Sequence, residues 1–273
     1  PLYSSAASDV YKRQRITRPD LLTRTEEVPF VDADGLTWRL RPNEFVDVVL
    51  LREGTWEPHT RAKMRELLRP GDVMFDVGAH IGTETVLASR LVAQGRVIAL
   101  EPAPWLRERL ARHLALNRCA NVTVLELAAG RAASEAMLVR PKGNDAMARF
   151  AEADHSNDEL SIAERVSSRV VRLDDLWMTL GRPRVRLLKI DVEGFESDVL
   201  EGAPSMLDST DHVLIEVTPS LGRARASEAM AILERCRFGL FVYEQGQGRW
   251  RGMNLSDLDS IQVDVFGRRQ AAS

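Results

Sequence analysis

Short apolar runs alternate with amphipathic segments along the middle of the chain. Five runs rich in apolar and β-branched residues cover 73–77, 96–100, 122–127, 185–190 and 213–217. Such runs are typical of strands that are buried on both faces of a sheet. The segments between them carry apolar residues at helical spacing, which predicts helices over 83–93 and 104–117. This alternation indicates a parallel sheet with right-handed crossovers and helices on both faces.

Two later apolar runs, 238–243 and 261–266, are separated by a glycine-rich connection that contains Gly246 and Gly248. A connection of this kind joins neighbouring antiparallel strands. We therefore predict an α/β fold with a Rossmann-like, doubly wound, mostly parallel seven-stranded sheet that has an antiparallel edge.

The chain divides into three parts by pattern. Residues 1–25 show no periodicity and are predicted to be a disordered or artefactual tail outside the fold. Residues 26–70 are predicted to form a small antiparallel β unit with a lead-in helix, and residues 71–268 to form the main domain. The elements expected in the β unit are a hairpin of 28–32 and 36–41 around Asp34-Gly35, a third strand over 45–51, and a helix over 61–68.

A polar, poorly periodic stretch lies inside the predicted main domain at residues 141–166. It follows a short predicted strand over 136–139. Long connections without secondary structure are uncommon in compact domains and are often functional or mobile. We expect this stretch to be a functional or mobile loop.

Composition excludes several classes of protein. The chain of 273 residues is 44% hydrophobic and 28% charged, which is an ordinary globular balance. Its net charge of −3 argues against a nucleic-acid partner. Two cysteines, Cys119 and Cys236, form neither a disulfide framework nor a zinc motif. No apolar run is long enough for a transmembrane helix, and no secretory signal is visible, so a cytoplasmic protein without a membrane partner is expected.

The first candidate site is the glycine loop after the first predicted main-domain strand. Gly78 and Gly82 bracket the loop and allow a ligand to approach the backbone, and Thr83 is expected to cap the following helix. The free N–H groups of that helix start favour an anionic group. Glu101 ends the next strand, where an acid is placed to accept hydrogen bonds from ribose hydroxyls. Together these features predict a nucleoside-binding domain.

The spacing of the loop separates two cofactors. Residues 76–82 read Asp-x-Gly-x-x-x-Gly, with His80 where the dinucleotide fingerprint requires glycine. This disfavours NAD and favours S-adenosylmethionine, which has no pyrophosphate. Asp76 is expected to orient the loop or to meet the ammonium group of the cofactor. An ordinary strand-to-helix turn is the alternative explanation of the two glycines.

The second candidate site is the charged end of the fourth main-domain strand, Lys189 to Gly194. Alternation along a strand places Lys189, Asp191 and Glu193 on one face. Three charges near the carboxyl end of a central parallel strand favour a ligand site at that edge of the sheet. A salt-bridged strand end is the alternative.

The chain resembles the FkbM family of S-adenosylmethionine-dependent methyltransferases. His80 stands where that family more often has Asn. The resemblance implies methyl transfer to a hydroxyl group of a small molecule, a sugar or another natural product. The matching segments are 54–58, 70–72, 76–82, 101–102, Asn117, 173–176, 189–194, 200–203 and 215–216.

A hydroxyl acceptor has to lose a proton, so a nearby base is expected. We predict Asp191, Glu193 and Glu57 as the catalytic candidates, and no metal, because Asp191 and Glu216 alone are a weak ligand set. The acceptor itself and the oligomeric state are left open. A nicotinamide-dependent oxidoreductase and a non-catalytic nucleoside-binding protein are the rival functions. The predicted cofactor-binding residues are Asp76, Gly78, His80, Gly82, Thr83 and Glu101.

Overall fold

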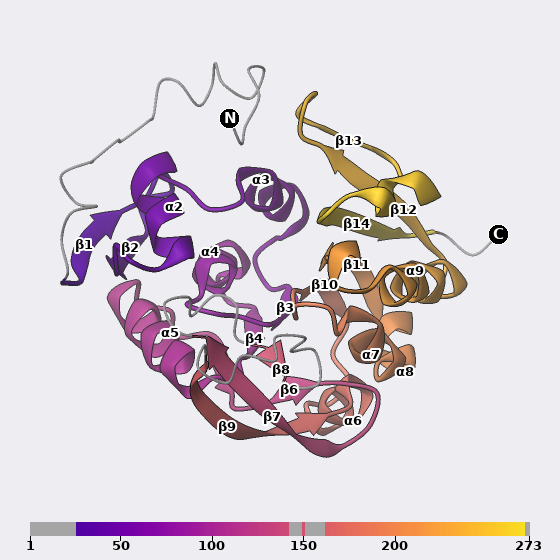
Figure 1. The fold of residues 1–273 in the computed structure, drawn as a ribbon, viewed down its shortest axis with the longest axis horizontal. Helices are drawn as coiled ribbons and strands as arrows, with labels where there is room; N and C mark the ends of the chain where they lie inside the picture. Colours follow the sequence, from indigo (N-terminus) through magenta and orange to yellow (C-terminus); the bar gives the residue numbers. More distant parts are fainter. Residues whose placement is uncertain (1–25, 142–148, 151–161, 271–273) are drawn as a thin grey trace.

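Eight strands form the central sheet of the computed structural model, which describes residues 26–141, 149–150 and 162–270 (Figure 1). The strand order is β13-β12-β14-β11-β10-β3-β4-β5. Five strands are parallel: β3 (Val73–Val77), β4 (Arg96–Leu100), β5 (Val122–Leu125), β10 (Val185–Ile190) and β11 (Thr210–Val217). The antiparallel edge consists of β14 (Val263–Arg269), β12 (Phe238–Glu244) and β13 (Arg249–Gly252).

The predicted fold class is confirmed, and all seven predicted strands are present. The sheet has one strand more than predicted, β13, which pairs with β12 at the edge. Its sequence is Arg-Trp-Arg-Gly, which has no apolar run and lacks β-branched residues. Edge strands are short and carry charges because one side of them is unpaired, so the apolar pattern does not identify them.

The strand order reverses at β3. The strand that follows it in sequence, β4, pairs with one side of β3, whereas β10 pairs with the other side. Ile190 of β10 lies opposite Val77, and Leu100 of β4 lies opposite the same residue. In open α/β sheets such a reversal leaves a crevice at the carboxyl ends of the strands, where ligands bind.

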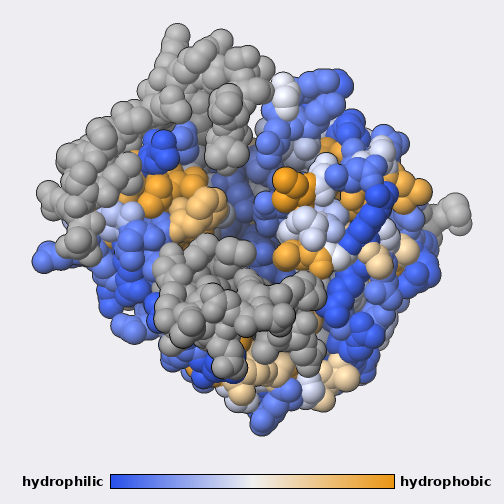
Figure 2. Space-filling model, in the orientation of Figure 1, coloured by the Kyte–Doolittle hydropathy of each residue, from blue (hydrophilic) through white to orange (hydrophobic). Residues whose placement is uncertain are grey.

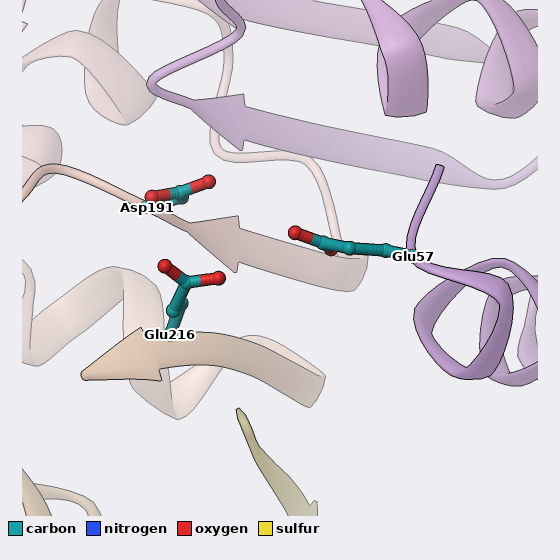
Figure 3. Close-up of side chains that lie close together, drawn as sticks. All are labelled: Glu57, Asp191 and Glu216. Carbon is teal, nitrogen blue, oxygen red and sulfur yellow. The ribbon is translucent and has the colours of Figure 1, made fainter. Parts of the chain in front are cut away.

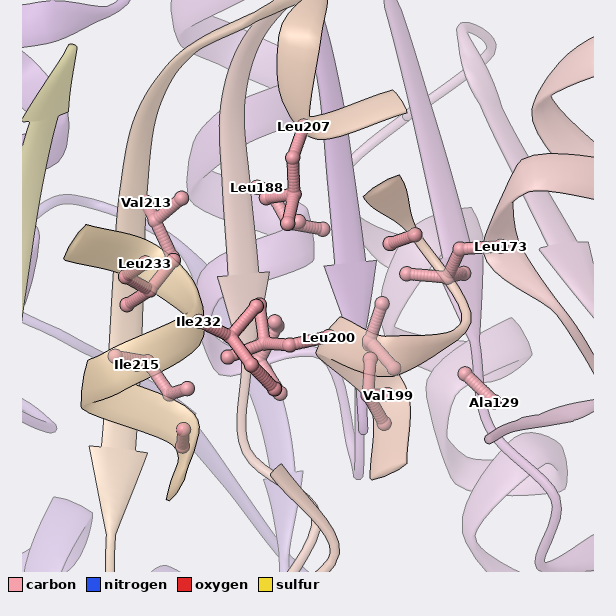
Figure 4. Close-up of a cluster of buried hydrophobic side chains, with 14 of the residues drawn as sticks. Ala129, Leu173, Leu188, Val199, Leu200, Leu207, Val213, Ile215, Ile232 and Leu233 are labelled. Carbon is pink, nitrogen blue, oxygen red and sulfur yellow. The ribbon is translucent and has the colours of Figure 1, made fainter. Parts of the chain in front are cut away.

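Both faces of the sheet are buried, as the uninterrupted apolar runs predict. Met74 and Leu187 face the first core, which includes α4 (Thr83–Val92) and α5 (Pro104–Leu116). Their neighbours Phe75 and Leu188 face the second core, drawn in part in Figure 4. The helices of the second core are α6 (Leu173–Thr179), α7 (Glu196–Glu201), α8 (Pro204–Asp208) and α9 (Pro219–Arg235).

The N-terminal unit differs from the prediction in one element. The hairpin is present as β1 (Val28–Val31) and β2 (Thr37–Leu40), but the predicted strand over 45–51 is wrong, because these residues form α2 (Phe45–Glu53). Valine and leucine content favours a strand locally, yet the buried residues Val46, Asp47, Leu50 and Leu51 recur at helical spacing. Burial of that face overrides the local propensity.

A buried ion pair fastens the hairpin to the main domain. Asp32 accepts hydrogen bonds from the indole N–H of Trp38 at 3.0 Å and from Arg61 of α3 (Pro58–Leu67) at 2.8 Å. Arg61 also donates to the carbonyl oxygen of Thr83, the first residue of α4, at 3.1 Å. The side chains of Asp32 and Arg61 are almost completely inaccessible to water. The N-terminal unit is therefore tied directly to the helix that follows the glycine loop.

A second, four-stranded sheet has the order β6-β9-β7-β8. The short strand predicted over 136–139 is confirmed as part of β7. The loop predicted over 141–166 is wrong in its described parts, because residue 141 ends β7, residues 149–150 form β8 and residues 162–166 belong to β9, all paired in this sheet. Residues 142–148 and 151–161 of that predicted loop lie outside the described residues. A 3₁₀ helix, η4 (Leu255–Asp259), precedes β14. The strands are β6 (Ala128–Ala129), β7 (Ser134–Pro141), β8 (Arg149–Phe150) and β9 (Ile162–Val171).

Among the described residues, no helix combines the length and the apolar character that crossing a bilayer would require.

We predict that Asp32→Ala lowers the free energy of unfolding by about 1–3 kcal/mol, because it leaves the Trp38 indole N–H buried without an acceptor while Arg61 keeps only Asp34 and the Thr83 carbonyl oxygen. Asp259→Ala is the control, since the ion pair of Asp259 with Arg223 is more than half exposed. It is expected to cost less than about 1 kcal/mol. Urea denaturation of both variants measures the difference, and equal losses would contradict the role of the buried pair.

Candidate active site

A cavity of about 470 Å³ opens at the carboxyl ends of the central strands. Its lining includes Gly78 after β3, Glu101 after β4, Asp191 after β10 and Glu216 of β11. Figure 2 shows a hollow near the centre of this face, with hydrophilic residues on its floor and hydrophobic patches on either side. The volume lies within the usual range of about 300–1,000 Å³ for small-molecule sites.

The glycine loop after β3 is held by both neighbouring strands. The backbone N–H groups of Gly78 and Ala79 donate to the carbonyl oxygen of Leu100 at 3.0 Å. The N–H of Asp191 donates to the carbonyl oxygen of Val77 at 3.0 Å. A Cβ atom on Gly78 would lie 1.8 Å from the carbonyl oxygen of Asp191, so only glycine fits there without displacement. The two loops therefore pack backbone against backbone.

The start of α4 differs from the prediction. Gly82, with φ +94°, occupies the N-cap position and offers no side-chain cap, so the prediction that Thr83 caps the helix is wrong. Thr83 is the first helical residue, and its hydroxyl donates to the carboxylate of Glu84. His80 has a φ of +51°, a left-handed conformation in which Asn and His are enriched among non-glycine residues. His80 thus occupies a position that would also suit Asn.

Glu101 lines the cavity from the end of β4. Its two carboxylate oxygens accept hydrogen bonds from the backbone N–H groups of His80 and Ala103, each at 2.8 Å. Burial raises the pKa of Glu101 to about 7, while these hydrogen bonds and the charge of Arg107 oppose the shift. Glu101 is thus fixed in orientation against the glycine loop.

Asp76 and Gly82 are not among the cavity-lining residues. Asp76 is completely buried at the end of β3 and accepts a hydrogen bond from the hydroxyl of Thr85. Burial raises the pKa of Asp76 to about 6, although the charge of Lys189 lowers it. Of the predicted cofactor-binding residues, Gly78, His80, Thr83 and Glu101 line the cavity.

Three carboxylates from separate elements converge at the other end of the cavity (Figure 3). Glu57 is the residue before α3, Asp191 directly follows β10, and Glu216 lies on β11. One carboxylate oxygen from each lies within 4.8 Å of the others. Lys189 donates to Asp191 Oδ2 at 3.0 Å. The structure therefore brings together two predicted catalytic residues, Asp191 and Glu57, with Glu216.

Burial and mutual repulsion determine the charge state of this cluster. Burial is the main cause that raises the pKa of Glu57 well above its ordinary value, and the charges of Glu84 and Asp191 add to it. The pKa of Glu216 is raised in the same way by burial and by Asp191. Although burial opposes it, the nearby carboxylates raise the pKa of Lys189 well above its usual range. Lys189 is thus charged at neutral pH.

Glu193, the third predicted catalytic residue, lines the cavity but is not a member of the three-carboxylate cluster. It lies in the loop after β10 with a φ of +51°, so the strict alternation expected from Lys189 to Glu193 ends where the strand ends. His59, the second residue of α3, is buried, and its Nε2 atom lies 2.8 Å from Asp264 Oδ2.

Glu84 is a site residue that sequence reasoning missed. It lies in the first turn of α4, lines the cavity and is only 3% exposed. The sequence feature that could have identified Glu84 is an acid just after the glycine loop, at the start of an otherwise apolar helical stretch. An acid there also reads as a favourable charge near a helix N-terminus, which conceals its burial.

Fold and site together define the class: a doubly wound α/β protein whose ligand cavity lies at the switch point of the sheet. The profile described as "Methyltransferase FkbM domain" matches residues 76–240, which is more than half of the chain. This chain belongs to the FkbM methyltransferase domain family.

Curated relatives support this assignment. The chain is 32% identical over 186 residues to "Methyltransferase 1" of Beauveria bassiana, a match that covers 62% of this chain and 73% of the relative. It is 25% identical over 213 residues to "Hexuronic acid methyltransferase AglP" of Haloferax volcanii, covering 75% of this chain and 84% of the relative. It is 34% identical over 157 residues to "31-O-demethyl-FK506 methyltransferase FkbM" of Streptomyces tacrolimicus, a match that covers 50% of this chain and 60% of the relative.

Solved structures resemble the chain more distantly. One is a putative O-methyltransferase from Klebsiella pneumoniae, with a TM-score of 0.47 and 11% identity over 78% of this chain and 79% of the other. The family assignment therefore rests on the sequence matches.

We predict that Gly78→Ala destabilises the protein by about 1–3 kcal/mol more than Gly181→Ala, because its Cβ overpacks the backbone of Asp191. Both glycines have a φ of +85°, but nothing lies within 4 Å of a Cβ at Gly181. Gly181→Ala therefore reports only the left-handed strain of about 1–2 kcal/mol. Chemical denaturation of the two variants checks this. Indistinguishable losses would mean that the two loops separate without cost.

Proposed function

We propose that this chain is an S-adenosylmethionine-dependent O-methyltransferase whose acceptor is a hydroxyl group of a small molecule or a sugar. One observation carries the proposal: a single cavity has an oriented acid, Glu101, at the end of β4 and a carboxylate cluster at the ends of β10 and β11. The family assignment supplies the reaction class. The two ends of the cavity then divide between cofactor and acceptor.

The residues present fit the cofactor. Gly78 leaves the loop backbone bare at the cavity wall, where a Cβ would collide with Asp191. Glu101 is the group that would accept hydrogen bonds from the ribose hydroxyls, and the N–H of His80 holds its carboxylate in place. Thr83 lines the same wall, while Asp76 and Gly82 support the loop from behind. When bound, S-adenosylmethionine supplies a sulfonium methyl group, which transfers as the carbon–sulfur bonding pair returns to sulfur.

The chain's own residues position the acceptor and remove its proton. Alignment of the two reactants supplies much of the rate, since well-oriented reactions reach effective molarities of about 10⁵–10⁸ M. Asp191 and Glu57 are our candidates to take the hydroxyl proton, because they belong to the cluster. Burial, together with the charge of Glu84, raises the pKa of Glu57, so its carboxylate holds a proton more strongly than an exposed carboxylate does. Glu193 remains a candidate from the cavity wall.

Several features support an oxygen acceptor of modest size. The names of two relatives specify a hexuronic acid and a 31-O-demethyl compound as their substrates. In this chain, apolar side chains such as Trp56 and Leu138 line the cavity beside the carboxylates, which suits a molecule with both apolar and hydroxyl parts. The acidic lining also disfavours a nucleic-acid phosphate backbone.

The family assignment removes the rival prediction of a nicotinamide-dependent oxidoreductase. Turnover in the following test would exclude the other rival, a non-catalytic nucleoside-binding protein. The test is to incubate the chain with S-adenosylmethionine and a panel of sugars, hydroxy acids and polyols. We expect acceptor-dependent release of S-adenosylhomocysteine and a product methylated on oxygen. Methylation on nitrogen or carbon alone, or binding without turnover for every acceptor, would contradict the proposal.

We predict that the affinity for S-adenosylmethionine weakens as the pH falls, because protonation removes the negative acceptor at Glu101. Its pKa of about 7 means that the carboxylate is ionised at pH 8 and mostly neutral at pH 6. If only the ionised form binds, Kd rises about tenfold over this interval. Isothermal titration calorimetry at a series of pH values measures it.

Glu101→Gln is the control for this dependence. This variant should bind S-adenosylmethionine more weakly than the wild type at pH 8. Its affinity should also vary little between pH 8 and pH 6, apart from any effect of Asp76 protonation. A wild-type Kd that does not change between pH 8 and pH 6 would remove Glu101 from the cofactor site.

A further inference from the structure

The charges on the cavity wall are strongly unbalanced. Apart from His80, one basic residue, Lys189, is found among the described lining residues. Like charges that share a desolvated site oppose each other's ionisation. A ligand with positive charge would relieve this repulsion. The acidic lining residues are Glu57, Glu84, Glu101, Asp191, Glu193 and Glu216.

The geometry of three of these carboxylates suits a metal ion. The ligand atoms of Glu57, Asp191 and Glu216 lie within 4.8 Å of one another and approach from three sides (Figure 3). Divalent cations bind carboxylate oxygens at about 2.0–2.6 Å, so ligands on opposite sides of one ion are about 4–5 Å apart. The three oxygens can therefore contact a single ion with small side-chain adjustments.

The hydrogen bonding of these groups is incomplete. The part of the chain that the structure describes provides no hydrogen-bond donor to the carboxylates of Glu57 and Glu216, whereas Asp191 accepts one from Lys189. Glu84, which is 3% exposed and faces the same cavity, has a buried Oε1 atom with no hydrogen-bond partner among the described residues. Of the charged groups around Glu57, Glu84 has the largest electrostatic effect on it. An unpartnered buried carboxylate oxygen beside the cluster is a second, independent sign of a missing positive ligand.

The sequence predicts no metal, because Asp191 and Glu216 alone are a weak ligand set, but the structure adds Glu57 to them. We propose that Glu57, Asp191 and Glu216 bind one divalent cation of the Mg²⁺ type, with Glu84 as an additional negative charge beside it. Oxygen ligands and the absence of cysteine or histidine from the cluster favour Mg²⁺, Mn²⁺ or Ca²⁺ over zinc.

The position of the site assigns it to the acceptor side, an assignment that rests on the proposed function. Glu101 follows β4 and Glu216 lies on β11, with β3 and β10 between them. Neighbouring strands are about 4.8 Å apart, so these two residues are separated by roughly 14 Å across the sheet. If a nucleoside binds at Glu101, the cation lies at the opposite end of the cavity, where the acceptor would bind. A cation beside an acceptor hydroxyl favours loss of its proton, which Glu193, the base candidate outside the cluster, would take while Glu57 and Asp191 hold the ion. Such a cation selects acceptors with two adjacent oxygen atoms, such as vicinal diols or hydroxy acids.

Titration of the full chain with Mn²⁺, without cofactor or acceptor, tests the site. The electron paramagnetic resonance signal of free Mn²⁺ reports binding, and added Mg²⁺ should compete. We expect one site per chain. Glu57→Gln and Glu216→Gln should each weaken binding by about tenfold or more, since each removes a charged ligand.

Glu193→Gln is the matched control, because it removes a carboxylate from the same cavity wall but outside the cluster. It should change Mn²⁺ affinity little. Absence of Mn²⁺ binding at millimolar concentration overturns the proposal. Equal weakening by Glu193→Gln also overturns it, because that result would indicate general attraction rather than ligation. If either Glu57→Gln or Glu216→Gln does not fold, the Mn²⁺ affinity of the other variant still tests the site.

The readout separates this proposal from the methyltransferase function. Mn²⁺ binding without methyl transfer to any acceptor would leave the site in place and contradict the function. Methyl transfer at full rate in excess chelator, together with no Mn²⁺ binding, would leave the function in place and contradict the site. An acceptor that carries both a hydroxyl and an ammonium group, which would satisfy the same carboxylates, predicts this second result and methylation on oxygen that depends on the amine.

Discussion

The backbone contact between Gly78 and Asp191 is the constraint on which the site depends. It joins the loop after β3 to the loop after β10, so the residues on both sides of the strand-order reversal keep fixed positions. The glycine loop presents His80 to the carboxylate of Glu101, and the second loop carries Asp191 into the acidic cluster. A side chain at Gly78 would separate these two halves. The two ends of the cavity are thus coupled through bare backbone.

The N-terminal unit completes the site rather than merely covering the sheet. Glu57 precedes α3 and has a left-handed φ of +36°, and the same helix carries Arg61, whose buried guanidinium contacts both Asp32 and the start of α4. Left-handed conformations of non-glycine residues are uncommon and cluster at functional sites. The fixed position of α3 therefore determines where the carboxylate of Glu57 meets Asp191 and Glu216.

The sequence predicts the main domain well because its signals are local. Buried parallel strands are continuous apolar runs, and Glu101 and Asp191 directly follow two of them, so topology alone places both at one edge of the sheet. Two errors have a common cause. The helix α2 was predicted as a strand, and β13 was missed, because tertiary burial and edge pairing decided these segments rather than their own composition.

The parts of the site that could not be predicted depend on contacts between distant segments. Nothing near Glu57 in the sequence indicates that it meets Glu216, and nothing near Glu84 shows that its oxygen is buried beside them. A local pattern also placed Glu193 with Asp191, because the end of the strand at Ile190 could not be located from alternation alone.

The assignment of the glycine loop and Glu101 to S-adenosylmethionine is tested most directly by thermal unfolding. The full chain is unfolded with S-adenosylmethionine, S-adenosylhomocysteine or NAD, each in a separate sample. A ligand at 100 times its Kd stabilises the folded state by about 2.7 kcal/mol. For a chain of this size, each kcal/mol raises Tm by roughly 2–4 °C. We expect both adenosyl ligands to raise Tm by several degrees and NAD to leave it unchanged. A shift with NAD and none with either adenosyl ligand would contradict the assignment of the glycine loop and Glu101 to S-adenosylmethionine.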